Sequence, residues 1–125
     1  MAGRIEERLK ELGITLPDAR APSANYVPFR ISGNQVFISG QVSAAGDEII
    51  KGKIGDGLTV EDGYAAARLC AVSILTQLKA AVGDDMDRAR VIKLGGFVNA
   101  TPDFTGPPAV MNGASDLMVE VFGDD

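Results

Sequence analysis

The stretch Val110-Met-Asn-Gly-Ala-Ser-Asp-Leu-Met-Val-Glu-Val-Phe122 carries apolar side chains at helical spacing, and Gly123 follows it. Its apolar stripe consists of Val110, Ala114, Leu117, Met118, Val121 and Phe122. Such a stripe has to be buried against a sheet or another helix. The segment therefore predicts a packed helix, and the elements that cover it must come from the preceding part of the chain.

Two further helices are predicted upstream. The longer one covers roughly residues 60–82, where apolar residues recur at helical spacing until Gly83. Thr59 is a suitable N-cap for it, and Asp62 three residues later gives a weaker form of the capping box. Residues 1–13 predict a short amphipathic helix, with an apolar side made of Ile5, Leu9 and Leu12.

Extended segments separate these helices. Val27–Ile31 and Gln35–Val42 predict a hairpin around Ser32-Gly33-Asn34, and a third strand is expected within Glu48–Ile54. Arg90–Thr101 predicts a strand in which Gly95-Gly96 marks a bulge or a close backbone approach. The order helix, hairpin, strand, long helix, strand, helix is typical of an α+β fold with helices on one face of a sheet.

The composition excludes several classes of function. A chain of 125 residues predicts a single domain, and its net charge of −5 is unfavourable for broad nucleic-acid binding. The absence of histidine removes Ser-His-Asp and Cys-His catalysis as well as the commonest metal ligand. Cys70 lies in an apolar run, which favours a small buried side chain over a reactive thiol.

Metal binding and membrane insertion are not predicted. Asp84, Asp85 and Asp87 follow the long helix without EF-hand spacing, a pattern typical of a solvated helix end. The charged N-terminus lacks the apolar core of a signal peptide, and no stretch approaches a membrane span. We therefore expect a cytoplasmic protein with no membrane partner.

A few polar residues and one glycine stand in otherwise apolar surroundings. Tyr26 precedes the first strand, Ser39 and Gln41 flank Gly40 in the second, and Asn112 lies on the last helix. A glycine inside a strand lets a ligand approach the backbone closely. Each feature alone is also typical of a satisfied polar group near a strand end.

Taken together, the segments of the chain resemble a known family. They are Tyr26-Val-Pro-Phe, Gly33-Asn-Gln-Val-Phe-Ile-Ser-Gly-Gln41, the alanine-rich helix, Val91-Ile-Lys-Leu-Gly-Gly-Phe-Val-Asn99, and the final helix through Gly123. In this order they resemble the RidA/YjgF family of small imine deaminases, earlier labelled endoribonuclease L-PSP. The resemblance is closest to a subgroup with an N-terminal helix, and it covers essentially the whole chain as one domain, residues 1–125.

The resemblance implies a chorismate-mutase-like α+β fold, in which two helices pack on one face of a mixed sheet. It also implies a homotrimer with ligand clefts between subunits. Family members hydrolyse reactive enamines and imines such as 2-aminoacrylate to 2-keto acids and ammonia, without a cofactor. The substrate-binding residues implied by the resemblance are Tyr26, Ser39, Gly40 and Asn112, with Phe97 as an apolar wall of the cleft.

The sequence departs from the family pattern after the last helix. Family chains continue into two strands, the first opening with an arginine that clamps the substrate carboxylate and the second carrying a glutamate near the attacking water. Arg30, Arg68 and Arg90 do not match that arginine, so no catalytic residue is assigned within this sequence. We expect the natural protein to be longer and these C-terminal strands to be absent from this sequence. The alternative is a naturally shortened, non-catalytic member.

Three functions follow from these features. The first is a 2-iminobutanoate/2-iminopropanoate deaminase, and the second is a non-catalytic trimer that binds a small carboxylate or carbonyl metabolite in the same cleft. The third is a ribonuclease, as the older family label suggests. The acidic composition and the absence of histidine disfavour that third function, because RNA binding needs clustered positive charge and RNA cleavage a general base.

Overall fold

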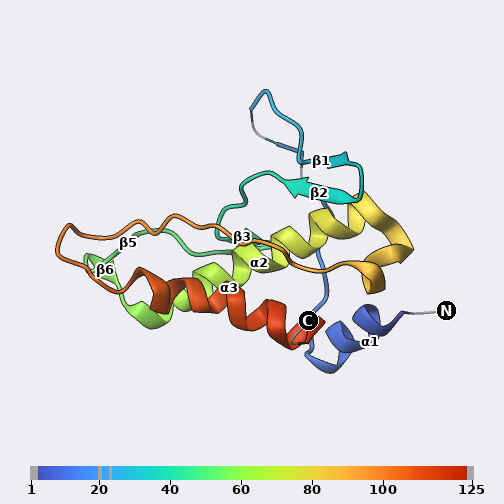
Figure 1. The fold of residues 1–125 in the computed structure, drawn as a ribbon. Coiled ribbons are helices and arrows are strands. Elements are labelled where there is room, and N and C mark those ends of the chain that lie inside the picture. Colours follow the sequence, from blue (N-terminus) through green and yellow to red (C-terminus); the bar gives the residue numbers. More distant parts are fainter. Residues whose placement is uncertain (1–2, 20, 23, 124–125) are drawn as a thin grey trace.

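The computed structural model describes residues 3–19, 21, 22 and 24–123. The helices are α1 (Arg4–Glu11), α2 (Val60–Val82), the short 3-10 helix η1 (Gly83–Arg88) and α3 (Pro107–Phe122). The strands are β1 (Phe29–Ser32), β2 (Gln35–Ile38), β3 (Ala44–Ala45), β4 (Glu48–Ile49), β5 (Lys53–Ile54) and β6 (Gly57–Leu58). Figure 1 shows α2 and α3 side by side. The β1–β2 hairpin lies on the side of α2 that faces away from α3. The α+β prediction is confirmed.

The long helix begins and ends where the sequence predicted. The Thr59 hydroxyl accepts a hydrogen bond from the Asp62 backbone N–H at 3.1 Å. In return the Asp62 carboxylate accepts one from the Thr59 N–H at 2.9 Å, which completes a capping box. Gly83 ends the helix with a φ of 59°, a backbone conformation that residues other than glycine rarely adopt. The last helix begins at Pro107, three residues before the predicted stretch, because a proline is tolerated in the first turn.

The predicted hairpin is confirmed, but its second strand ends at Ile38 and not at Val42, so Ser39, Gly40 and Gln41 follow the strand. Phe29 pairs with Ile38 and Ser32 pairs with Gln35, which leaves Gly33-Asn34 as a two-residue turn. Gly33 has a φ of 61°, and a glycine at the first central position is the signature of a type II′ turn. The turn therefore fixes the register of the two strands.

The remaining strand predictions need correction. Glu48–Ile54 is not one strand but is divided into β4 and β5, with Gly52 between them at a φ of 144°. Arg90–Thr101 runs as an extended segment, joined to a strand only where Ala100 bridges Ile54. A strand needs at least one hydrogen-bonded neighbour along its length, and in the described part of the chain this segment is bridged only at Ala100. The described strands consequently form three two-stranded units in place of one mixed sheet.

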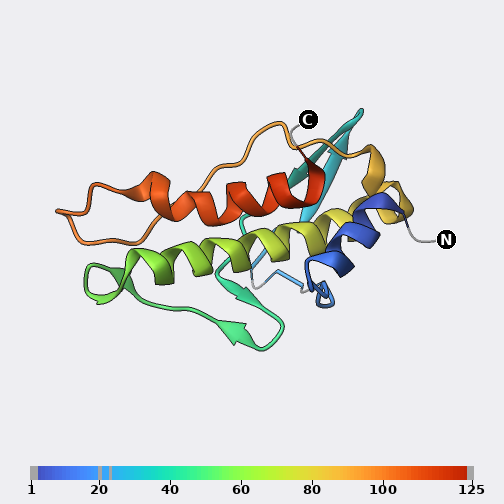
Figure 2. The ribbon, with the colours of Figure 1, turned by 90° about the horizontal axis from the view of Figure 1, so that it is seen from below.

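The core lies between α1, α2 and α3. All six residues of the apolar stripe on α3 are buried, so that prediction is confirmed. They pack with Ile5 and Leu9 of α1, and with α2 residues Ala67, Ala71 and Leu75. Figure 2 shows α1 at the C-terminal part of α2, and Figure 1 shows it near the C-terminal end of α3. The N-terminal helix is therefore part of the core.

The expectation that no stretch approaches a membrane span needs correction at α2 and η1. The segment Val60–Arg88 is long and apolar enough to cross a membrane, judged by length and composition only. The core helix of a soluble protein passes the same test. In this fold Ala67, Ala71 and Leu75 of that segment are buried in the helical core. Because 22% of the apolar stretch is buried in the described fold, packing within this chain accounts for only part of its apolar composition.

Candidate functional site

The polar residues at the end of β2 lie beside the turn that precedes β1. The Ser39 N–H donates to the Pro28 carbonyl at 2.9 Å, and its hydroxyl donates to the Val27 carbonyl at 2.5 Å. Ser39 is thereby held next to the Tyr26–Val27 turn, and its hydroxyl oxygen keeps lone pairs for a further donor. Tyr26 is 48% exposed. Tyr26 and Ser39 therefore lie close together along the chain path at an accessible place. We call Tyr26, Ser39 and Gly40 the strand-end group.

Gly40 leaves this group open on one side. A side-chain carbon built on Gly40 would meet no atom within 4 Å. A ligand can therefore reach the backbone there, as the sequence led us to expect for a glycine in this position. The strand-end group thus combines the Ser39 hydroxyl, the exposed Tyr26 of the adjacent turn and open space beside Gly40.

A small cavity of about 50 Å³ with both polar and apolar walls adjoins the end of β2. Gln41 lines it together with Ser73, Thr76 and Gln77 of α2. Thr76 and Gln77 are buried, and the Ser73 hydroxyl donates to the Ala44 carbonyl at 2.6 Å. The sequence analysis missed these α2 residues because they stand inside an otherwise apolar helix. A volume of this size fits one or two water molecules.

The other two predicted binding residues lie elsewhere. Phe97 is fully exposed on the extended segment, and Asn112 is exposed on α3. The residues that precede them in the chain, Gly96 and Met111, are in close contact. A side-chain carbon built on Gly96 would lie 2.1 Å from the Met111 sulfur. Gly96 is therefore a place where the backbone closely approaches another segment, one of the two possibilities predicted for Gly95-Gly96. Among the described residues, no hydrogen bond or ion pair joins this second group to the strand-end group.

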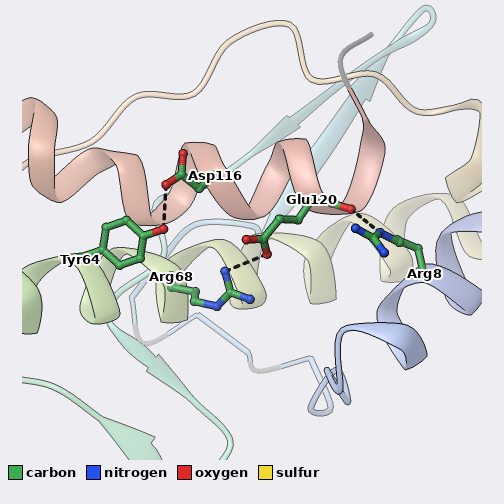
Figure 3. Close-up of polar contacts among 5 residues, drawn as sticks. All are labelled: Arg8, Tyr64, Arg68, Asp116 and Glu120. Atoms are coloured by element: carbon green, nitrogen blue, oxygen red, sulfur yellow. Dashed lines mark hydrogen bonds and ion pairs between the residues drawn. The ribbon is translucent and has the colours of Figure 1, made fainter.

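Figure 3 shows a row of polar contacts along α2 and α3 that sequence reasoning missed. The Tyr64 hydroxyl donates to the Asp116 carboxylate at 2.7 Å, and Arg68 pairs with Glu120 at 3.1 Å. Both pairs are separated by 52 residues, so the two helices run in the same direction with constant register. The sequence could have indicated this row, because Tyr64 and Arg68, like Asp116 and Glu120, are four residues apart and so share one helix face.

These contacts hold the helices together. Hydrogen bonding to the Asp116 carboxylate, the largest cause, raises the pKa of Tyr64 above 10.0. The Arg8 guanidinium of α1 donates to the Glu120 carbonyl at 2.7 Å, near the end of α3. A cation at a helix C-terminus interacts favourably with the helix dipole. The row therefore fastens all three helices and is not placed for chemistry at the strand-end group.

Asp87 fastens the other end of α1. Its carboxylate accepts hydrogen bonds from the backbone N–H groups of Arg4 and Ile5, both at 2.8 Å. These bonds, first the one from Ile5, hold the pKa of Asp87 below 3.8. The acidic residues after α2 thus include a helix cap supplied from 83 residues away in sequence. In the described ranges, no group of three potential ligands could hold a metal ion.

Cys70 lies on α2 and is partly buried. Burial is the main cause that raises the pKa of its thiol. A raised pKa disfavours the thiolate, which is the reactive form. The structure therefore agrees with the interpretation of Cys70 as a packing residue.

Paired helices against small β units, with an accessible polar strand end, define the class of chorismate-mutase-like α+β proteins. Residues 6–125 match the family described as "YjgF/chorismate mutase-like, putative endoribonuclease". The chain therefore belongs to the YjgF/RidA family.

Similar proteins come from both eukaryotes and bacteria. "Protein TCP17" of Trypanosoma cruzi is 47% identical over 126 residues, spanning 99% of this chain and 78% of that protein. The crystal structure of Atu1372 from Agrobacterium tumefaciens, described as of unknown function, shares 48% identity and a TM-score of 0.85. It covers 96% of this chain and 75% of its own. The crystal structure of a "putative endoribonuclease" from Shewanella oneidensis shares 36% identity and a TM-score of 0.90, covering 96% and 80%.

Proposed function

We propose that this protein hydrolyses reactive enamines and imines, such as 2-aminoacrylate, to 2-keto acids and ammonia without a cofactor. The observation that carries the proposal is the strand-end group of a YjgF/RidA family member, in which Gly40 leaves backbone groups open beside a hydroxyl and a phenol. Hydrolysis of a C=N bond needs a positioned water and groups that polarise the bond. Open backbone groups and hydroxyls meet both needs.

The proposed roles follow from the geometry. The Ser39 hydroxyl donates to Val27, so its remaining lone pairs are suited to accept a hydrogen bond from the substrate nitrogen. The backbone at Gly40 and the Tyr26 phenol then position the substrate and a water. Water adds to the imine carbon, the C–N bond breaks, and ammonia leaves as the ketone forms. We assign no catalytic residue within residues 1–125, and propose that an arginine beyond α3 binds the substrate carboxylate, since Arg offers a forked pair of donors.

We further propose that the protein works as a cytoplasmic homotrimer with the cleft between subunits. Large apolar side chains are exposed on and around the hairpin and on the extended segment, which supports an association surface. These residues are Val27, Ile31, Phe37, Val42, Val91, Ile92 and Phe97. Light scattering coupled to size-exclusion chromatography tests the assembly, and a monomer at all concentrations would contradict it.

The test of the activity uses freshly generated 2-aminoacrylate and follows ammonia and pyruvate. The protein is expressed from its native reading frame, and its intact mass is measured first. We expect turnover above the uncatalysed rate, reduced by Tyr26→Phe and by Ser39→Ala. The matched controls are Tyr64→Phe and Ser115→Ala, which alter the same residue types away from the strand-end group. Product formation at the uncatalysed rate would refute the proposal.

The second candidate is a binding protein that holds a small carboxylate or carbonyl metabolite in the same place. The exposed Tyr26 phenol supports it, because a phenol can donate a hydrogen bond to a carboxylate or carbonyl oxygen without taking part in any reaction. Pyruvate or 2-oxobutanoate would then raise the melting temperature without any turnover of the imine.

Ribonuclease activity is the third possibility, because the Shewanella oneidensis relative is described as a "putative endoribonuclease". A net charge of −5 and no histidine give the chain neither a broad basic surface for an RNA backbone nor the usual general base. We expect no cleavage of single-stranded RNA above a buffer control. Cleavage that persists through repeated purification would contradict this expectation.

A further inference from the structure

Figure 1 shows α1 close to the C-terminal end of α3. A polar cavity lies at this end of the molecule, lined by residues of α1, η1 and α3 and of the segment after η1. Its volume is about 270 Å³, and its walls comprise Arg4, Asp87, Arg88, Ala89, Arg90 and Phe122. Three of the 12 basic residues of an acidic chain therefore line one cavity. We infer that this arginine cavity binds a tetrahedral oxyanion, namely phosphate or the phosphate group of a small metabolite. The inference is independent of the function proposed above.

The three guanidinium groups are available to a ligand to different degrees. Within the described residues, no carboxylate lies within ion-pair distance of Arg90. Arg88 faces Asp85 at 3.8 Å, with side chains 82% and 63% exposed, and such a pair contributes little. Arg4 donates to the Asp87 carbonyl at 3.4 Å and keeps its other donors. A ligand can therefore recruit all three without breaking a strong interaction.

Asp87 is the negative group in the cavity wall, and its carboxylate is already engaged. Both of its oxygens accept hydrogen bonds from the first backbone N–H groups of α1. Its charge is partly offset by these amides and by the helix dipole, which leaves an excess of positive charge among the lining side chains. The amides of α1 are thus occupied, and the guanidinium groups are left to bind the anion.

The number and type of the basic side chains in the cavity wall favour one class of ligand. One guanidinium satisfies a planar carboxylate through two parallel bonds, whereas three separate guanidinium groups match the several oxygens of a tetrahedral dianion. A volume of 270 Å³ corresponds to roughly nine water molecules at about 30 Å³ each, so a phosphate or a small phosphomonoester fits. Since the cavity joins Arg4 of α1 to the segment after η1, a bound anion would also fasten α1 to the body.

The experiment titrates the protein with inorganic phosphate at constant ionic strength, followed by amide chemical shifts and by melting temperature. We expect saturable shifts at Arg4, Arg88 and Arg90 and a rising melting temperature, whereas sodium chloride has no such effect. Arg88→Gln/Arg90→Gln should weaken binding by about tenfold or more, because two charge-assisted hydrogen-bonding groups are lost.

The matched control is Arg30→Gln/Lys51→Gln, which removes the same charge from exposed positions elsewhere. Both double variants should keep the wild-type circular dichroism spectrum, and the chemical-shift map of the wild-type protein does not depend on either. Tighter binding of O-phosphoserine than of phosphate would assign the cavity to a phosphorylated metabolite, and equal binding would assign it to the free ion. Shifts that are non-saturable, or equal weakening in the two variants, would overturn the inference.

Discussion

Gly113 sits where α3 comes closest to α2, and replacing it by alanine should force the two helices apart. A side-chain carbon at this position would lie 2.0 Å from the Tyr64 carbonyl oxygen and 3.1 Å from the Ala67 side chain. Contacts under 3.0 Å are essentially never seen for such a carbon, and a backbone oxygen cannot rotate away. The helices would have to separate locally by about 1 Å or more, and interiors packed like crystals resist such shifts.

The expected cost is the balance of two effects. Overpacking a core costs typically about 1–3 kcal/mol, and a clash with backbone belongs at the upper end of that range. Alanine in place of glycine within a helix returns about 1 kcal/mol of intrinsic propensity. Gly113→Ala should therefore destabilise the fold by about 2 kcal/mol, and lower the melting temperature by several degrees.

The assay is urea unfolding followed by circular dichroism, with two reference variants. Gly63→Ala meets only side-chain atoms, of Ile54 at 2.8 Å and Val110 at 2.9 Å, so its cost should be smaller. Gly95→Ala meets nothing within 4 Å and should be nearly neutral. A Gly113→Ala protein as stable as the wild type would refute the close approach of the two helices.

Three other predictions concern hydrogen bonds that fasten the helices. Asp87→Asn should loosen α1, seen as faster hydrogen exchange there. In the unaltered protein the folded pKa of Asp87 lies below 3.8, so its stabilisation is present above that pH and is lost as the pH falls through the folded value. The raised pKa of Tyr64 predicts a phenol that titrates above 10.0 by ultraviolet absorbance, and Asp116→Asn should bring it back towards 10.0. Its contribution is complete below pH 10.0 and is lost as the pH rises through the folded value. Thr59→Ala should cost about 1 kcal/mol in urea unfolding, since it removes a helix cap, and an unchanged midpoint would contradict the capping box.

Local patterns predicted the helices well because their determinants lie close together in sequence. The capping box of α2 needs only Thr59 and Asp62, and the stripe on α3 repeats within one helix. The hairpin likewise depends on the Gly33 turn. The Asp87 cap was not predictable in this way, because its partners Arg4 and Ile5 are more than 80 residues distant and share no local pattern with it.

The candidate site was predictable only as a set of separate residues. Tyr26, Ser39 and Gly40 come together because the hairpin brings the turn before β1 against the end of β2. Asn112 and Phe97 gather around a different contact, that of Gly96 with Met111. Whether the two groups face one ligand depends on the assembly, which a single chain does not specify. Family resemblance predicted their shared role, and this remains a prediction.

The extended segment before Ala100 shows what an apolar pattern does and does not determine. Its apolar residues Val91, Ile92, Leu94, Phe97 and Val98 predicted a strand, and the backbone is indeed extended, yet it forms no ladder before Ala100. An apolar run supplies side chains that suit burial, whereas a ladder also requires a hydrogen-bonding neighbour from elsewhere in the chain. Leu94 and Val98 are partly buried against the core, but Ile92 is 80% exposed and Phe97 fully exposed, so only part of the apolar pattern is buried within this chain. Because a soluble monomer rarely leaves such side chains in water, the same observation that contradicts the strand supports the proposed association of subunits.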